Sequence, residues 1–510
     1  MKINFKSLAF SLTLFLLPLA QFTKENSKLL DFNTFGNLIL INITCLILII
    51  FISFLIYFVN KTLDFYDTLF FLLIFYNVIF YFSKLKTFFL EFTSLASYFS
   101  LGSIIVICFF LTFLIKKKIF NRFLFFFIIL NYVNIIIFSI SINTYEKNEI
   151  KVNHDNFFFE NEKIFERNGD SSTPNIYFII MDGMTSLEHA SKILKIDYTD
   201  HWRYLEKNDF NIVPSRSNYN TTYLSLASII QLDYVVRPTS PKYYDRNNFW
   251  PYLLSKINKK PNLINLLEEN NYKFQWYGNM TASCKNYSYN KDFCSSKEFN
   301  STYYVFNSFY ANTPLITILR KFLPKLMLSF YGDRIDSISN FINTNDLKKN
   351  YDKNYFTLIH HLSPHPPYIF NKDCSIKEEL NTSIASNENN GYKDAYLCSL
   401  KKIERLIDYL NINDPEGLII ITADHGWNID KNNTQTIEDL VDERTKIYNS
   451  IKVKSECLKD APLKLDNINS VRLVLGCALN IKPIYKKTEI FYGFQEENKE
   501  DYGKIFKLDF

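Results

Sequence analysis

Three apolar runs of strand length in the second half of the chain are each followed directly by side chains that can bind a metal ion. These side chains are Asp182 after the first run, His360, His361 and His365 after the second, and Asp424 and His425 after the third. Taken singly, Asp182-Gly183 and Asp424-His425-Gly426 are equally typical of turns. Ligands of parallel sheets bind beyond the carboxyl ends of the strands, so their joint position after strands favours a shared site. Two carboxylates and an imidazole suit Zn²⁺ or Mn²⁺.

A candidate nucleophile lies between the first two runs, where a polar segment turns into an apolar, helix-like run over 217–230. Thr222 is expected at the start of this helix, where free amide groups and the helix dipole favour a bound anion. A metal-bound hydroxyl there loses its proton more readily and can attack phosphorus. The alternative is that Thr221 or Thr222 only caps the helix. Spacing by itself favours this simpler role.

The order of these motifs resembles that of the alkaline phosphatase/sulfatase superfamily. The motifs are strand-Asp182-Gly183, then Thr222-x-x-Ser225, then His360-His361-x-x-Pro-His365-Pro-Pro-Tyr368, then Asp424-His425-Gly426. Within the superfamily, the chain resembles the bacterial membrane branch that contains lipoteichoic acid synthase and lipid A phosphoethanolamine transferases. That branch places several transmembrane helices, commonly five, before an exported catalytic domain.

The resemblance implies a role for each matched residue. It implies a single metal ion bound by Asp182, Thr222, Asp424 and His425, with Thr222 as the nucleophile. His361 and His365 match histidines near the phosphoryl group, as substrate ligands or proton donors. For His360 we expect a structural role.

Three departures from the family pattern limit what is carried over. The two transferase types usually have Glu where this chain has Asp182, which is nearer the sulfatase pattern. Sulfatases need Cys or Ser at the start of Cys/Ser-x-Pro-x-Arg, but here Ile212 precedes Pro214 and Arg216. Isoleucine cannot form formylglycine, so sulfatase activity by the usual route is excluded. Gly183 replaces a second Asp, which favours one metal ion over richer metal shells.

The elements that must position these residues follow an alternating pattern. Apolar runs of strand length occupy Asn175–Met181, Tyr272–Tyr277, Tyr355–Ile359 and Gly417–Thr422, and helix-like segments include Asn262–Asn270 and Tyr396–Leu410. Strands buried on both faces that alternate with helices indicate an α/β domain with a mainly parallel central sheet flanked by helices.

The first part of the chain has a different composition. Five apolar stretches, at 6–22, 36–59, 67–83, 98–115 and 121–143, are each near the length that crosses a bilayer as a helix. The sequence therefore predicts an α-helical transmembrane bundle of about five helices over 1–145, a linker over 146–172 and an exported catalytic domain over 173–510. The first stretch is also compatible with a signal peptide, although its end is a poor cleavage site.

Charges and cysteines both predict that the second domain lies outside the cell membrane. Lys and Arg are more frequent in the segments expected on one side of the bundle, among them 116–118, which predicts that this side is cytoplasmic. Five crossings then place the catalytic domain in the periplasm or on the extracellular side of a bacterial inner (plasma) membrane. Six cysteines follow residue 146, and an even number in an exported domain suggests disulfides. Pairing of sequence neighbours predicts Cys284–Cys294, Cys374–Cys398 and Cys457–Cys477.

Three functions are compatible with these features. The first is transfer of a phospholipid head group, of phosphoethanolamine or phosphoglycerol type, through a Thr222 intermediate to an envelope glycan or lipid. The second is hydrolysis of phosphate or sulfate esters, and the third is an inactive envelope protein that keeps the fold. The formal net charge of +5 is modest and the basic residues are scattered, so nucleic-acid binding gains no support.

Overall fold

The computed structural model describes the helix over 32–59 with residue 60, scattered residues between 15 and 80, and most of the chain from residue 165 onward. In that part the described residues are 165–166, 174–235, 260–278, 293–298, 336–344, 354–366, 368–377, 389–427, 437–493 and 505–508.

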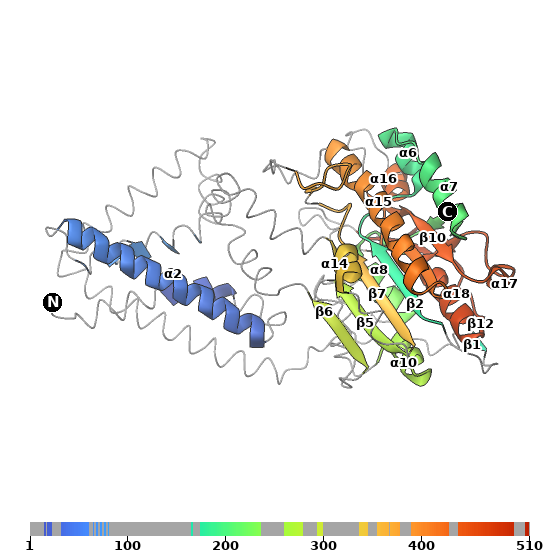
Figure 1. The fold of residues 1–510 in the computed structure, drawn as a ribbon, viewed down its shortest axis with the longest axis horizontal. Helices are drawn as coiled ribbons and strands as arrows, with labels where there is room; N and C mark the ends of the chain where they lie inside the picture. The colour runs from blue at the N-terminus through green and yellow to red at the C-terminus, as the bar shows by residue number, and fades with distance from the viewer. Residues whose placement is uncertain are drawn as a thin grey trace. The chain divides into compact units, whose positions relative to one another are not determined.

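A seven-stranded sheet forms the centre of the catalytic part, in the order β3-β10-β8-β2-β7-β5-β6 (Figure 1). Its strands are β3 (Asn211–Ile212), β10 (Asn449–Lys452), β8 (Leu418–Ala423), β2 (Ile176–Met181), β7 (Tyr355–His361), β5 (Lys273–Gly278) and β6 (Cys294–Glu298). The five strands from β8 to β6 are parallel, and only β10 runs antiparallel to its neighbours β8 and β3. The predicted α/β domain and all four predicted strands are confirmed.

Helices cover both faces of this sheet because its strands are apolar on both sides. Side chains of β2 alternate between two cores, with Phe178 in one and Ile179 in the other. The first core is completed by α8 (Thr222–Gln231), α10 (Asn262–Glu269) and α18 (Asn467–Leu479). The second is completed by α6 (Leu187–Leu194), α7 (Thr199–Lys207), α14 (Ser337–Thr344) and α15 (Asn389–Asn413).

Short elements complete the described catalytic part. A three-stranded sheet has the order β11-β4-β9, and two pairs, β1-β12 and β13-β14, are antiparallel. Their bounds are β11 (Leu465–Asp466), β4 (Ser215–Arg216), β9 (Lys446–Ile447), β1 (Phe165–Glu166), β12 (Lys482–Pro483), β13 (Ile490–Gly493) and β14 (Ile505–Leu508). The remaining helices are α16 (Ile437–Thr445) and α17 (Ser455–Leu458). Strand β9 follows α16 directly and leads into β10, which lies between β3 and β8 in the main sheet.

One described helix is long and apolar enough to cross a membrane. It is α2 (Phe32–Val59), with an apolar stretch over Leu38–Val59 that matches the predicted span 36–59. Its large apolar side chains are mostly exposed, including Ile47 and Phe58. The spans expected at 6–22 and 67–83 are described only at scattered residues, and those at 98–115 and 121–143 lie outside the described residues. The five-helix bundle and the domain boundaries therefore stay predictions.

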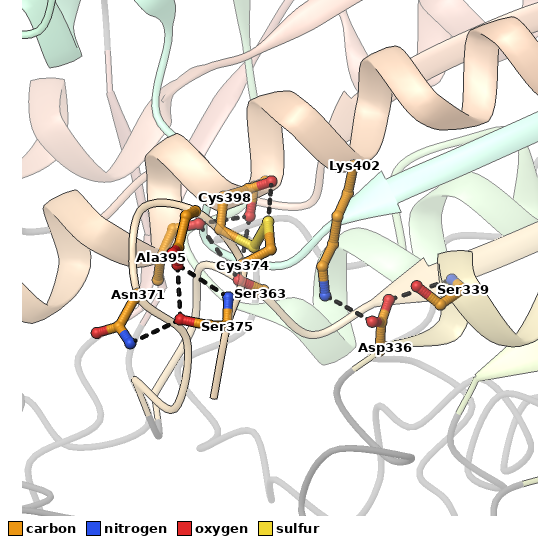
Figure 2. The surroundings of a disulfide bond; sticks show 11 residues. Asp336, Ser339, Ser363, Asn371, Cys374, Ser375, Ala395, Cys398 and Lys402 are labelled. Atoms are coloured by element: carbon orange, nitrogen blue, oxygen red, sulfur yellow. Dashed lines mark hydrogen bonds and ion pairs between the residues drawn. A yellow bond between two sulfur atoms is a disulfide. The ribbon is translucent and has the colours of Figure 1, made fainter. Parts of the chain in front are cut away.

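Two of the three predicted disulfides are present in the described residues. Cys374 pairs with Cys398, and Cys457 pairs with Cys477, with Cα–Cα distances of 4.9 and 5.6 Å. Cys294 is also disulfide-bonded, and its expected partner Cys284 lies outside the described residues. Figure 2 shows that the Cys374–Cys398 bond joins the segment after β7 to α15.

A hydrogen bond and a buried ion pair accompany the Cys374–Cys398 disulfide. Ser363 Oγ lies 3.0 Å from Ser399 Oγ on α15, and Lys402 Nζ lies 2.7 Å from Asp336 Oδ2 (Figure 2). The disulfide, the serine pair and the ion pair fix α15 to both the β7 loop and the start of α14.

Candidate active site

Two carboxylates and one imidazole converge beyond the carboxyl ends of β2 and β8. Asp182 follows β2, Asp424 and His425 follow β8, and one ligand atom from each lies within 4.8 Å of the others. Nε2 of His425 lies 3.8 Å from Asp182 Oδ1 and 3.4 Å from Asp424 Oδ2. Both of these oxygens are buried and have no hydrogen-bond partner among the described residues. Burial of carboxylate oxygens without hydrogen-bond partners costs free energy. Two such oxygens beside one imidazole nitrogen therefore fit a site that binds a cation.

Backbone groups fix the orientation of this cluster. Asp424 Oδ1 accepts hydrogen bonds from the backbone N–H groups of Gly183 and His425, both at 2.9 Å, which turns Oδ2 toward the imidazole. Nδ1 of His425 lies 2.8 Å from the carbonyl oxygen of Gly426, so Nδ1 carries the proton. The lone pair is then on Nε2, the atom that faces the carboxylates, as in metal-binding histidines.

Thr222 joins the cluster through its hydroxyl group. Thr222 Oγ1 lies 3.1 Å from Nε2 of His425, at the first residue of α8. The preceding Thr221 has no side-chain capping bond, and its buried hydroxyl has no partner among the described residues. The helix-cap alternative therefore does not describe this structure. Thr222 as a whole residue is only partly buried.

The two adjacent histidines of β7 differ in their surroundings. The ring nitrogens of both histidines have no hydrogen-bond partner among the described residues. Nε2 of His360 nevertheless lies within ion-pair distance of Asp182, 3.4 Å from its Oδ2. Burial lowers the pKa of His361 to about 3, and the charge of Lys402 adds to this effect. The pKa of His360 is raised, since its contact with Asp182 outweighs the cost of burial. His360, expected to be structural, thus lies beside the cluster, and the catalytic role of His361 stays a prediction.

His365 lies beside the cluster on the loop that follows β7. Its backbone N–H donates to the carbonyl oxygen of Asp182 at 3.1 Å, and its Nδ1 donates to the carbonyl oxygen of Pro366 at 2.8 Å. Its Nε2 has no hydrogen-bond partner in the part of the chain that the structure describes, and the residue is only partly buried. Burial by itself would raise the pKa of Asp182, but the nearby His365, His360 and His425 lower it well below its usual range. Asp182 is therefore ionised, as a metal ligand must be.

Two further residues line the cluster, and sequence analysis missed both. Trp427 follows the Asp424-His425-Gly426 motif, and its ring lies 5.2 Å from that of His365. The guanidinium of Arg444, at the end of α16, lies 5.5 Å from the Trp427 ring. Trp427 adjoins the motif and could have been found from it. Arg444 lies far along the chain, and no sequence signal links it to the site.

The sulfatase-like Pro214-Ser215-Arg216 segment makes its described contacts with other parts of the domain. Ile212 belongs to β3 at the edge of the main sheet, and Arg216 pairs with Asp442 and donates to Thr445 Oγ1. The hydroxyl that faces the cluster is therefore that of Thr222. This agrees with the exclusion of formylglycine chemistry.

This fold and site place the chain among the α/β enzymes of the alkaline phosphatase/sulfatase superfamily. A family model named Sulfatase matches residues 174–446, more than half of the chain, so the chain belongs to the sulfatase family. The match begins just before β2 and ends at β9, and it includes every residue of the cluster. No curated protein matches the chain.

Solved structures similar to this chain include phosphoethanolamine transferases. The periplasmic domain of EptC from Escherichia coli is 11% identical, with a TM-score of 0.42, over 68% of this chain and 95% of that one. A zinc complex of that domain is 10% identical, with a TM-score of 0.40, over 67% and 98%. The integral membrane lipooligosaccharide phosphoethanolamine transferase A from Neisseria meningitidis is 15% identical, with a TM-score of 0.40, over 75% and 70%.

Proposed function

We propose that this chain is a membrane-anchored, metal-dependent phosphotransferase. It would move a phospholipid head group, of phosphoethanolamine or phosphoglycerol type, to an envelope glycan or lipid. The observation that carries the proposal is the position of the Thr222 hydroxyl, 3.1 Å from Nε2 of His425 at the start of a helix. A hydroxyl beside two unpaired carboxylate oxygens has the surroundings of an activated nucleophile.

The residues present fit one divalent metal ion, Zn²⁺ or Mn²⁺. Asp182, Asp424, His425 and Thr222 would hold it. The unpaired buried oxygens of the two carboxylates and the lone pair on Nε2 of His425 are the donors that it needs. When bound, such an ion lowers the pKa of a coordinated hydroxyl group and offsets charge on phosphoryl oxygens.

The transfer would take place in two displacements. In the first, the Thr222 hydroxyl releases its proton to water, Oγ1 forms a bond to phosphorus, the bond from phosphorus to the lipid alcohol breaks, and the alcohol leaves with a proton. We assign donation of this proton to His365, whose Nε2 has no partner among the described residues, rather than to His361, which lies near Lys402 and Asp336. In the second, an acceptor hydroxyl attacks phosphorus and releases its proton to water, the bond to Thr222 breaks, and Thr222 regains a proton.

We also propose the cellular setting that this reaction needs. Residues 1–145 would form a multi-pass anchor in a bacterial inner membrane, 146–172 a linker, and 173–510 the catalytic domain in the periplasm or on the extracellular side. The apolar helix α2 and the disulfides of the catalytic part support this arrangement. A tethered site keeps the lipid donor within reach, and the donor and the acceptor would meet it at the bilayer surface.

Mass spectrometry of the full-length protein tests the proposal. After incubation of the zinc-loaded protein with head-group-labelled phosphatidylethanolamine or phosphatidylglycerol, we expect a labelled adduct on Thr222 and none in Thr222→Ala. Rapid release of free head group without an acceptor would support the ester hydrolase instead. An unlabelled wild-type protein with full zinc content would support the inactive envelope protein. Equal turnover by Thr222→Ala would contradict both enzymatic functions.

A further inference from the structure

Arg444 lies against both segments that carry the cluster. Its Nη2 donates to the carbonyl oxygen of Asn220 at 2.9 Å, two residues before Thr222. Its Nη1 lies 3.4 Å from the carbonyl oxygen of Gly426, the same oxygen that accepts from Nδ1 of His425. The guanidinium group therefore spans the space between the nucleophile segment and the histidine segment.

Gly426 allows the backbone around Arg444 to approach this closely. Its N–H donates to the carbonyl oxygen of Arg444 at 2.7 Å, and a Cβ at Gly426 would meet the carbonyl oxygens of Glu443 and Lys446, the latter at 2.8 Å. Any side chain at position 426 would push this segment away. Gly426, the glycine of the Asp-His-Gly motif, thus allows Arg444, 18 residues later in the sequence, to lie beside the cluster.

Trp427 holds the guanidinium plane and ties it to the rest of the site. The Arg444 guanidinium lies 5.5 Å from the Trp427 ring, a cation–π distance. The same ring packs edge-on to His365 and stacks on Tyr392 at 6.0 Å. It also lies against Gly183, where a Cβ would be 3.3 Å from Trp427 Cε3. One indole therefore joins the cation to the loops that carry Asp182 and His365.

The charge of Arg444 has no ion-pair partner in the described structure. No acidic side chain among the described residues lies within ion-pair distance of its guanidinium, although the carboxylates of Asp424 and Asp182 interact with it electrostatically. Two of its five N–H groups are used by backbone oxygens, and the side chain is only partly buried. A half-buried cation without an ion-pair partner is costly unless an anion joins it.

We infer that Arg444 binds the non-bridging oxygens of the phosphoryl group beside Thr222, and that Trp427 positions its guanidinium for this contact. Guanidinium groups bind tetrahedral oxyanions through two parallel hydrogen bonds, which a lysine cannot reproduce. The inference rests on the proposed phosphotransferase function, since it assigns the anion to the group that Thr222 attacks. The alternative is that Arg444 only holds the backbones of Asn220 and Gly426 in place.

Calorimetric titration of the zinc-loaded, full-length protein with inorganic phosphate tests the inference without turnover. We expect Arg444→Gln to weaken phosphate binding by about 10- to 100-fold, the effect of losing a charge-assisted pair, with unchanged zinc content. Arg216→Gln is the matched control, because its guanidinium is also partly buried but pairs with Asp442. The control should bind phosphate as the wild type does.

Three results would overturn the inference. These are wild-type phosphate affinity in Arg444→Gln, loss of zinc together with phosphate, and an equal loss in the control. If Arg444→Gln does not fold, Arg444→Lys decides: affinity within about twofold of the wild type contradicts a two-point contact, and a loss of about fivefold or more supports it. The adduct experiment separates the two proposals. Suppose that phosphate binding depends on Arg444 but that Thr222 is never labelled. This result would refute the proposed transferase function, whereas the inference that Arg444 binds an anion would stand.

Discussion

The substitution Asp424→Asn separates the two roles of this carboxylate. Its Oδ1 accepts two backbone hydrogen bonds at 2.9 Å, whereas its Oδ2 faces His425 at 3.4 Å with no hydrogen-bond partner among the described residues. An asparagine carbonyl can replace Oδ1, which leaves the NH₂ group in the position of Oδ2. The change therefore keeps the hydrogen bonds to Gly183 and His425 and removes one proposed metal ligand. It also removes one of two facing buried charges, so the metal-free variant should be no less stable than the wild type.

The expected size of the effect follows from linkage between binding and folding. Zinc at about 1,000 times its dissociation constant stabilises a protein by about 4 kcal/mol. Loss of an anionic ligand should weaken zinc binding by at least about 100-fold. Loss of a residue that only hydrogen-bonds to a metal ligand already weakens metal binding by about 10- to 100-fold. At the same zinc concentration the stabilisation then falls to about 1.4 kcal/mol. For a domain of this size, the lost 2–3 kcal/mol corresponds to a shift of roughly 5 °C in the zinc-dependent Tm.

Thermal unfolding of the full-length protein with EDTA and with added zinc measures this difference. The wild type should gain several degrees on zinc addition, and Asp424→Asn should gain little. Asp442→Asn serves as the control, since Asp442 pairs with Arg216 and Lys446 outside the cluster. A full zinc-dependent gain in Asp424→Asn would refute the assignment of Oδ2 as a ligand. A large loss of stability in the metal-free variant would show that its hydrogen bonds depend on the charge.

Two further predictions concern the backbone at the site and the buried histidine of β7. Gly426→Ala should destabilise the domain by about 1–3 kcal/mol and weaken phosphate binding, because its Cβ overlaps the carbonyl oxygen of Glu443; wild-type stability by chemical unfolding would contradict this close approach. Stability should also fall as the pH drops from about 6.5 to 5, since the pKa of His361 is about 3 in the folded chain and ordinary in the unfolded chain. In this pH range the unfolded chain binds a proton at His361 that the folded chain does not bind. The free energy of unfolding therefore falls by about 1.4 kcal/mol per pH unit from this group. Unfolding curves at several pH values should show a smaller slope for His361→Gln, and an unchanged slope would refute a neutral buried His361.

The elements of the catalytic domain could be predicted because they depend on local pattern. Ile176–Met181 and Leu418–Ala423 are continuous apolar runs, and a strand buried on both faces needs no more than that. Pairing of neighbouring cysteines also succeeded for Cys374–Cys398 and Cys457–Cys477. The antiparallel strand β10 and the edge strand β3 were not predicted, because strand direction depends on pairing partners and β3 has only two residues.

The histidines show where local pattern fails. Adjacent residues of a strand point to opposite faces, so only one of His360 and His361 can lie beside Asp182. The register of β7 against β2 places His360 opposite Ile180 and His361 opposite Met181, and the ring beside Asp182 is that of His360. A single sequence contains no measure of that register, so it could not tell which of the two rings lies beside Asp182.

By itself, the sequence determined the type of fold. It also gave Asp182, Asp424 and His425 as a candidate metal site and Thr222 as a candidate nucleophile, since all four follow strands or begin a helix. Only the tertiary structure decided that the Thr222 hydroxyl faces His425 rather than capping its helix. Only the tertiary structure brought Arg444 to Trp427. The physical reason is that such contacts join segments that are far apart in the sequence. The distances between these segments depend on close packing of the backbone at Gly426 and not on spacing along the chain.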